Sequence, residues 1–252
     1  MRRWWWLMVV AFVLVLVARL PARWLTVWGP GSLVCEGATG TIWHGQCARL
    51  RLSTGVLGPL AWRLRPAALL RGRIAATLDL AADGARCDGH IARTFAGGWE
   101  IENANCRFDL QRAARLPLWQ GAPPPWPAAL GGRLRATVAR AQLRFAPFAI
   151  RQLQGELHAD ELSQDATPLG SYRLVFSEAS TVHGAVVGEL VDQGGPYDLR
   201  GRLRLTAAPP GYYVEGTVAA RPDAPAAVRE RLQFLGPADA AGRRPFALEG
   251  TF

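Results

Sequence analysis

Lysine is absent from this 252-residue sequence, so all 29 basic residues are arginine and the formal charge is +9. Without lysine there is no Walker loop, and no nucleophile elbow is present either. The acids Glu156, Asp160 and Glu161 lie close together, but nothing beside them would separate their pKa values. The sequence therefore predicts a protein that is not an enzyme and needs no cofactor or small-molecule substrate.

Histidine and cysteine are also scarce, with four of each. His44 with Cys47, and Cys87 with His90, each place the two residue types three positions apart, a spacing that could chelate zinc. The spacings are not those of a known zinc finger, so we predict no metal site, with zinc as the alternative interpretation. The other two histidines are isolated, and we expect them on strand surfaces.

All four cysteines follow the first apolar segment, and an even number in an exported domain is typical of disulfides. Three pairings are possible. Each neighbouring pair lies in two adjacent strand-like segments that a hairpin would bring side by side, which favours Cys35 with Cys47 and Cys87 with Cys106. Closing loops of this size stabilises a fold by roughly 3 kcal/mol each.

The arginines are scattered along the chain and not clustered. In residues 49–52 and 202–205 they alternate with leucine, which is the pattern of a solvated strand face. A nucleic-acid-binding protein needs a basic stripe or patch. We therefore predict no nucleic-acid partner, and attraction to anionic lipid headgroups fits the charge better.

Only one long apolar run is present, from Trp4 to Ala18. It is short for a membrane span and would suit a cleavable signal peptide. However, tryptophans stand at both ends, and a helix from Trp4 to Trp24 would be about 30 Å long, matching the hydrocarbon thickness. Cleavage after Ala18 or Ala22 is disfavoured because leucine stands near each site where a small residue is wanted. An uncleaved anchor is the prediction.

Positive charge is balanced across this anchor, so the cysteines decide its orientation, because disulfides form outside the cytoplasm. We expect a single-pass protein of the inner membrane. Residues 1–28 would form a cytoplasmic stub, the transmembrane helix and an interfacial flank, and residues 29–252 a periplasmic β-rich domain. The residues expected at the membrane interface are Arg2, Arg3, Trp4, Trp5, Trp6, Arg19, Arg23, Trp24 and Trp28.

Beyond the anchor, apolar and polar residues alternate in short segments separated by glycine. This period-2 alternation is the signal of half-buried strands and favours antiparallel meanders. The predicted fold is mainly β: a curved antiparallel β-meander, open like a groove, with a few short helices. The clearest predicted strands are 48–52, 74–80, 99–108, 134–138, 172–176, 186–191, 197–205 and 212–218. Turns are predicted at 57–59, 83–84, 97–98, 131–132, 194–196 and 209–211.

A proline-rich segment, residues 121–127, is too stiff for a helix or a central strand. It joins two predicted meander halves, about 33–118 and 130–252. Two short helices are expected at residues 66–71 and 110–116.

The best helix candidate runs from residue 224 to residue 235, with Asp223 as its N-cap. A glycine follows its end, as is typical of a helix C-terminus. Val228, Leu232 and Leu235 would share one face and pack on the sheet.

Motifs of turn glycines and packing aromatics run in order along the body. They are Gly40-Thr41-Ile42-Trp43-His44-Gly45, Leu57-Gly58-Pro59-Leu60-Ala61-Trp62-Arg63-Leu64, Leu169-Gly170-Ser171-Tyr172-Arg173-Leu174 and Asp192-Gln193-Gly194-Gly195-Pro196. Together with the leading apolar run and the last strand, they resemble the type II secretion system protein N family almost end to end. The cysteines are not part of that pattern.

The resemblance implies an inner-membrane protein accessory to the machine that exports folded proteins across the outer membrane. Its expected partners are the inner-membrane platform components of that machine and membrane lipids. It supplies no catalytic residues.

An open meander leaves unpaired backbone at its edges, so we expect an assembly or scaffold role through edge-strand or groove contacts. Trp43 and Trp62 form the candidate contact surface, although both could be ordinary core aromatics. The alternative function is lipid binding, because a long curved sheet with one apolar face, tethered to a membrane, has the shape of a lipid-carrying groove. Its leucines and valines would line the groove.

Overall fold

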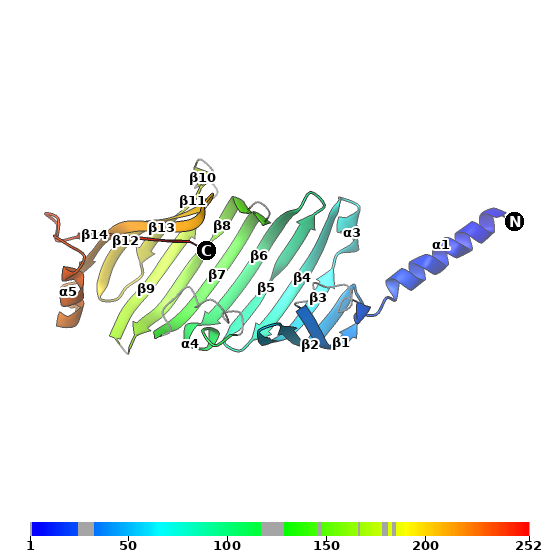
Figure 1. Ribbon diagram of the computed structural model, residues 1–252, viewed down its shortest axis with the longest axis horizontal. Coiled ribbons are helices and arrows are strands. Elements are labelled where there is room, and N and C mark those ends of the chain that lie inside the picture. Colours follow the sequence, from blue (N-terminus) through cyan, green and yellow to red (C-terminus); the bar gives the residue numbers. More distant parts are fainter. Residues whose placement is uncertain are drawn as a thin grey trace.

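The computed structural model describes residues 2–24, 33–116, 129–145, 148–165, 167–177, 181–182 and 185–251. Most of them belong to one antiparallel sheet, in which the strands follow one another in chain order and only β10 lies off this path (Figure 1). The elements are α1 (Arg2–Ala18), β1 (Leu33–Gly40), β2 (His44–Leu52), β3 (Gly55–Leu64), α3 (Pro66–Leu69), β4 (Arg73–Ala82), β5 (Ala85–Thr94), β6 (Gly98–Asp109), α4 (Leu110–Ala113), β7 (Leu130–Phe145), β8 (Phe148–Gln164), β9 (Thr167–Phe176), β10 (Thr181–Val182), β11 (Ala185–Asp192), β12 (Tyr197–Ala207), β13 (Pro210–Ala220), α5 (Ala226–Gln233) and β14 (Arg244–Thr251).

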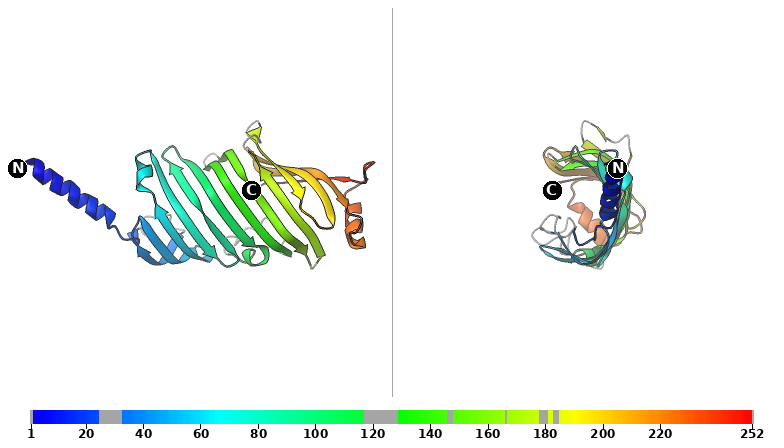
Figure 2. Two further views of the ribbon diagram at one scale, coloured as in Figure 1. Left: turned by 180° about the vertical axis from the view of Figure 1, so that it is seen from behind. Right: turned by 90° about the vertical axis from the view of Figure 1, so that its right-hand side faces the viewer.

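The sheet is curved into a trough. Seen along its length in Figure 2, right, it forms an open arc with α5 inside the curve. The predicted mainly β fold, an open antiparallel meander with few helices, is confirmed. Each predicted strand segment lies within an observed strand, and the observed strands are longer because alternation continues past the clearest positions.

The sheet is continuous across the middle of the chain. β6 pairs with β7 from Gly98↔Arg144 to Asp109↔Arg133, so the two ends of the interval 117–128 join neighbouring strands. The proline-rich residues 121–127 lie outside the described residues.

Some of the glycines that predicted turns lie inside strands. The turn at 83–84 is a two-residue hairpin, and 194–196 connects β11 to β12. Residues 57–59 and 131–132, however, lie inside β3 and β7, so these two turn predictions are wrong. Both sites are β-bulges, where the register shifts and glycine takes a positive φ: +144° at Gly58 and +127° at Gly132. A Cβ on Gly58 would lie 2.1 Å from the Ala81 carbonyl oxygen.

The short helices fall where they were expected but are smaller. α5 begins at Ala226 with Pro225 at its N-cap, so the prediction that Asp223 caps it is wrong. A residue before proline is pushed out of the helical region, which prevents an earlier start. Val228 and Leu232 are buried as predicted, whereas Leu235 lies beyond the helix and is 39% exposed.

The leading helix α1 ends at Ala18 and does not continue to Trp24 as predicted. Pro21 disfavours helical conformation in the residue before it, and it forms an isolated β-bridge with Thr41. Among the described residues, no helix combines the length and apolar character needed to cross a membrane.

A loop before β14 forms hydrogen bonds with β12 and β13. The carboxylate of Asp239 accepts hydrogen bonds from the backbone N–H groups of Ala241 and Arg243, at 2.9 and 2.8 Å. The guanidinium of Arg243 then donates to Asp198 on β12 at 2.6 Å and to Thr217 on β13 at 3.0 Å. This contact with Arg243 holds the pKa of the Asp198 carboxyl below its usual value.

Because the folded-state pKa of Asp198 is depressed, its ion pair stabilises the fold above the unfolded-state pKa and is lost as the pH falls through the folded-state pKa. We predict that Arg243→Gln raises the pKa of Asp198 toward 3.8 and lowers the free energy of unfolding at neutral pH by about 1 kcal/mol. Carboxyl NMR and urea unfolding at several pH values measure both. An unchanged Asp198 pKa in the variant would contradict this assignment.

Candidate functional site

A row of directly paired apolar residues crosses the whole sheet. Starting from the disulfide-bonded pair Cys87↔Cys106, the register can be followed in both directions to β1 and β14 without meeting a polar side chain. We call these thirteen positions the apolar row. They are Ala38, Cys47, Leu60, Leu80, Cys87, Cys106, Ala136, Leu157, Leu174, Leu190, Gly201, Gly216 and Phe246.

On one side of the row, the positions two residues away on each strand lie on the same face and are apolar too. They form three paired runs: a register shift between β5 and β6 separates the first from the second, and the pairing of β9 with β11 stops one residue short of joining the second to the third. The runs are Gly45, Trp62, Leu78 and Gly89; Ala104, Val138, Gly155 and Phe176; and Gly188, Leu203, Val214 and Leu248.

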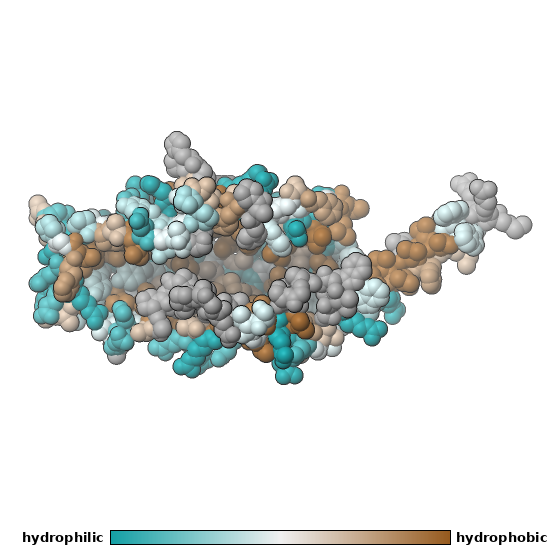
Figure 3. Space-filling view, viewed as in Figure 1, coloured by the Kyte–Doolittle hydropathy of each residue, from teal (hydrophilic) through white to brown (hydrophobic). Residues whose placement is uncertain are grey.

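This apolar face lines the inside of the trough. The helix α4 packs against it, because the buried Ala113 and Leu116 contact Leu80, Ala82 and Phe108. Figure 3 looks into the hollow between the two rims, where apolar residues cover parts of the inner wall and hydrophilic ones gather along the outside. Most residues of the apolar row are only half-buried.

Two glycines on the apolar face leave room for aromatic rings from the neighbouring strands. A Cβ on Gly188 would lie 2.7 Å from the ring of Phe176, and one on Gly45 would lie 2.4 Å from the ring of Trp62. Glycine is therefore required at both positions for the neighbouring aromatic ring to cover the strand.

The structure joins Cys35 to Cys47 and Cys87 to Cys106, the pairing that the adjacent strands favoured. Their Cα atoms are 5.6 and 4.1 Å apart. Because both disulfides use the thiols that a zinc site would need, the zinc alternative is excluded for these cysteines. No cluster of three potential metal ligands occurs in the described part of the chain.

The end of α1 is attached to the sheet by the segment Gly40–Gly45. The indole N–H of Trp43 donates to the carbonyl of Val17 at 2.9 Å. Two backbone bonds reinforce this joint: Ile42 N–H to the Leu20 carbonyl at 3.0 Å, and Ala22 N–H to the Gly40 carbonyl at 3.1 Å. We call this set of contacts the helix–sheet joint.

Trp62 supports the same segment from β3, donating its indole N–H to the carbonyl of Ile42 at 3.1 Å. Trp43 and Trp62 are both half-buried. The structure thus brings the two candidate contact residues together around residues 40–45, each with an internal hydrogen bond. A contact with a partner protein stays a prediction.

The two central motifs pack on each other. Ser171 N–H donates to the Gly194 carbonyl at 2.8 Å, and Gln193 N–H donates to the Ser171 carbonyl at 2.7 Å. Beside them, the hydroxyl of Tyr172 donates to the Leu169 carbonyl at 2.6 Å, and burial raises the pKa of this tyrosine to about 12. Tyr172 therefore stays neutral, and these hydrogen bonds hold the turn after β11 against β9.

The opposite face of the sheet is polar and rich in arginine. In one row, Arg86, Arg107, Arg135, His158 and Arg173 are directly opposite one another on β5 to β9. The neighbouring row supplies acids that balance part of this charge. The carboxylate of Glu156 bonds Arg173 and His158, and these contacts hold its pKa below the usual value.

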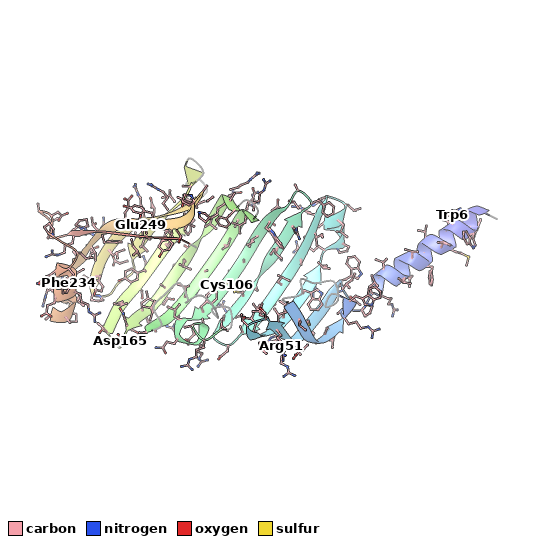
Figure 4. The ribbon with its side chains drawn as sticks, viewed as in Figure 1. Trp6, Arg51, Cys106, Asp165, Phe234 and Glu249 are labelled. Carbon is pink, nitrogen blue, oxygen red and sulfur yellow. A yellow bond between two sulfur atoms is a disulfide. The ribbon has the colours of Figure 1, made fainter. Side chains whose placement is uncertain are left out.

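Several predicted membrane-interface residues lie around α1. Figure 4 labels Trp6 on the helix, which extends away from the sheet. Trp4, Trp5 and Trp6 are all more than half exposed, and Trp24 is 49% exposed. Arg19 and Arg23 follow the helix. The side chains of Arg2 and Arg3 and the residues Trp28 and His183 lie outside the described part of the chain.

Sequence reasoning missed the apolar row, and it missed β8, which pairs with β7 and β9 in the centre of the trough. Alternation is present in β8, but Gly155 interrupts its large apolar side chains between Leu153 and Leu157, and bulges shift its register on both sides. The signal that could have found it is the spacing of Leu153, Leu157 and Ala159.

The fold and site define a trough-shaped, single-sheet protein with an apolar leading helix. The family described as Type II secretion system (T2SS), protein N matches residues 32–247. The chain belongs to this family.

Two curated relatives carry the name Type II secretion system protein N. The relative from Aeromonas hydrophila is 29% identical over 267 residues, covering 97% of this chain and 96% of its own length. The relative from Vibrio cholerae serotype O1 is 27% identical over 235 residues, covering 88% of this chain and 86% of its own length. No solved structure matches the chain.

The helix–sheet joint leads to a prediction about Trp43. Trp43→Phe keeps the aromatic ring but removes the donor to Val17, so the joint should open more often. We expect the amide of Ile42 to exchange its hydrogen about fivefold faster, as the loss of roughly 1 kcal/mol implies. Hydrogen exchange measured by mass spectrometry or NMR tests this, with β12 amides as the unaffected control. Equal protection of Ile42 in both proteins would rule out this role for Trp43.

Proposed function

We propose that this chain is a non-enzymatic component of a type II secretion system, held at the inner membrane by α1 with its sheet in the periplasm. The observation that carries the proposal is its similarity to proteins of that name over nearly their whole length. Its role is to assemble or support the platform of the machine that exports folded proteins.

The surroundings of α1 support attachment to the membrane. Its apolar side chains, including Phe12 (67%) and Leu16 (51%), are exposed, and it extends away from the sheet in both Figure 1 and Figure 2. Its 17 residues give about 26 Å of helix, and a bilayer accommodates such a segment by local thinning. Apolar side chains that are exposed in this way are stabilised by contact with lipid.

The open edges of the sheet support an assembly role. Among the described strands, β1 pairs only with β2 and β14 only with β13. An unpaired strand edge offers N–H and C=O groups to an added strand. β1 lies beside the helix–sheet joint, so its edge is the one nearest to partners embedded in the same membrane.

The attachment can be tested with a charged variant of α1. Phe12→Asp combined with Leu16→Asp should move most of the protein from the carbonate-washed membrane fraction to the soluble fraction, because each aspartate costs about 3 kcal/mol in a membrane-spanning helix. Leu70→Asp is the matched control, since Leu70 is 91% exposed on the body. Retention of the doubly substituted protein in the membrane would argue against attachment by α1.

The assembly role can be tested by photocrosslinking in cells. A photoreactive residue at Val34, which is 46% exposed on β1, should capture an inner-membrane platform component. The same residue at Arg107, on the polar face of a central strand, should capture much less. Equal capture at both positions, or capture of proteins unrelated to secretion, would count against the edge of β1 as the contact.

A further inference from the structure

In the part of the chain that the structure describes, no helix or second sheet covers the apolar face of the trough along its middle. Among the described elements, α4 lies at one rim and α5 at the far end, while β5 to β9 form the wall between them (Figure 1). The largest fully buried side chains of the described residues are only Val186, Val228 and Cys47. A sheet of this size normally buries its apolar face beneath a second layer. A contiguous uncovered apolar surface marks a binding site.

The chemistry of this surface selects its occupant. The apolar row offers no hydrogen-bonding side chain, and its backbone groups are engaged with neighbouring strands on both sides. A peptide or a sugar laid along it would give up hydrogen bonds to water and receive none in exchange. A hydrocarbon chain has no hydrogen bonds to water to lose, and it gains apolar contact along its whole length.

The length and position of the apolar row also fit a hydrocarbon chain. Thirteen strands at roughly 4.8 Å spacing make the row about 58 Å long, which exceeds the roughly 15 Å of one leaflet's hydrocarbon. The row starts on β1 and β2, the strands that the helix–sheet joint connects to α1. Its opposite end lies near α5, which contacts β13. The end next to the apolar helix is open to hydrocarbon arriving from a bilayer.

We propose that the trough binds the hydrocarbon chains of membrane lipids along the apolar row, with entry at the β1 end beside α1. Only the entry route rests on the membrane attachment proposed above. The headgroup stays outside the floor, where the polar rims and water can solvate it.

Neighbouring residues of β8 provide a matched test, because Leu157 belongs to the apolar row and His158 to the polar face. Benzoylphenylalanine replaces each in turn in the full-length chain, which is irradiated in cell membranes and analysed by intact mass spectrometry. Adducts of lipid mass are expected at position 157 and not at position 158. Equal adducts at both positions, or none at position 157 either in cells or with the vesicles described below, would overturn the proposal.

A second pair of variants tests the floor without a crosslinker. Ala136→Arg places a charge on the apolar row, and Thr137→Arg places it on the opposite face of the same strand. Lipid co-purified with Ala136→Arg should fall about tenfold, as expected when a charge replaces apolar contact. Thr137→Arg should match the unmodified chain. A β-sheet circular dichroism spectrum and a cooperative thermal transition like those of the unmodified chain show that each variant is folded. Unchanged lipid in folded Ala136→Arg would refute binding along the row.

A third experiment distinguishes lipid binding in the trough from attachment of the chain to the membrane by α1. Benzoylphenylalanine at position 157 in the Phe12→Asp, Leu16→Asp protein is mixed with vesicles of phosphatidylethanolamine and phosphatidylglycerol. If the trough binds lipid, adducts form even with this protein released from the membrane. Adducts from vesicles but none in cells would show a binding trough whose entry route is wrong, whereas no adducts in either case would reject the trough itself.

Discussion

The hydrogen-bond ladder between adjacent strands is the constraint on which this structure depends. All strands that the structure describes belong to one sheet, so each is positioned chiefly by its two neighbours. A slip of one residue at any pair would turn the apolar side chains of every later strand to the polar face. The apolar row from β1 to β14 therefore requires correct register at every step.

The chain secures that register differently in its two halves. Early strands are linked covalently: Cys87 and Cys106 are directly opposite each other, and Cys47 joins β2 to β1. Arginine–carboxylate pairs occur along the whole sheet, and among the later strands one pair joins adjacent strands while two reach past an intervening strand. These pairs are Arg173 with Glu156, Arg221 with Asp192 and Arg243 with Asp198. The cysteines of the early strands and these arginines thus share one structural task, which is to link strands of the sheet.

Alternation in the sequence was enough to predict strands, the open meander and the disulfide pairs, because each depends on neighbours in the chain. It could not predict the row across the sheet. At Gly58 and Gly132 the glycine marks a bulge inside a strand and not a turn, and each bulge shifts which residues are opposite. The end of α1 was also not predicted. The apolar run and the flanking tryptophans favoured a longer helix, whereas Pro21 disfavours helical conformation in the residue before it.

The two ends of the trough differ chemically, and this gives the molecule a direction. At the β1 end, the carbonyl groups of Val17 and Leu20 after α1 accept hydrogen bonds from Trp43 and Ile42, so the apolar helix is fixed to the sheet. At the other end, α5 carries its buried Val228 and Leu232 on a short amphipathic helix, with arginines on its solvent side. The exposed apolar side chains of α1 suit an apolar environment, such as the one the proposed attachment would give it, and an amphipathic helix suits a boundary with water. The row that joins these ends therefore runs from a surface suited to the membrane toward one suited to the aqueous compartment.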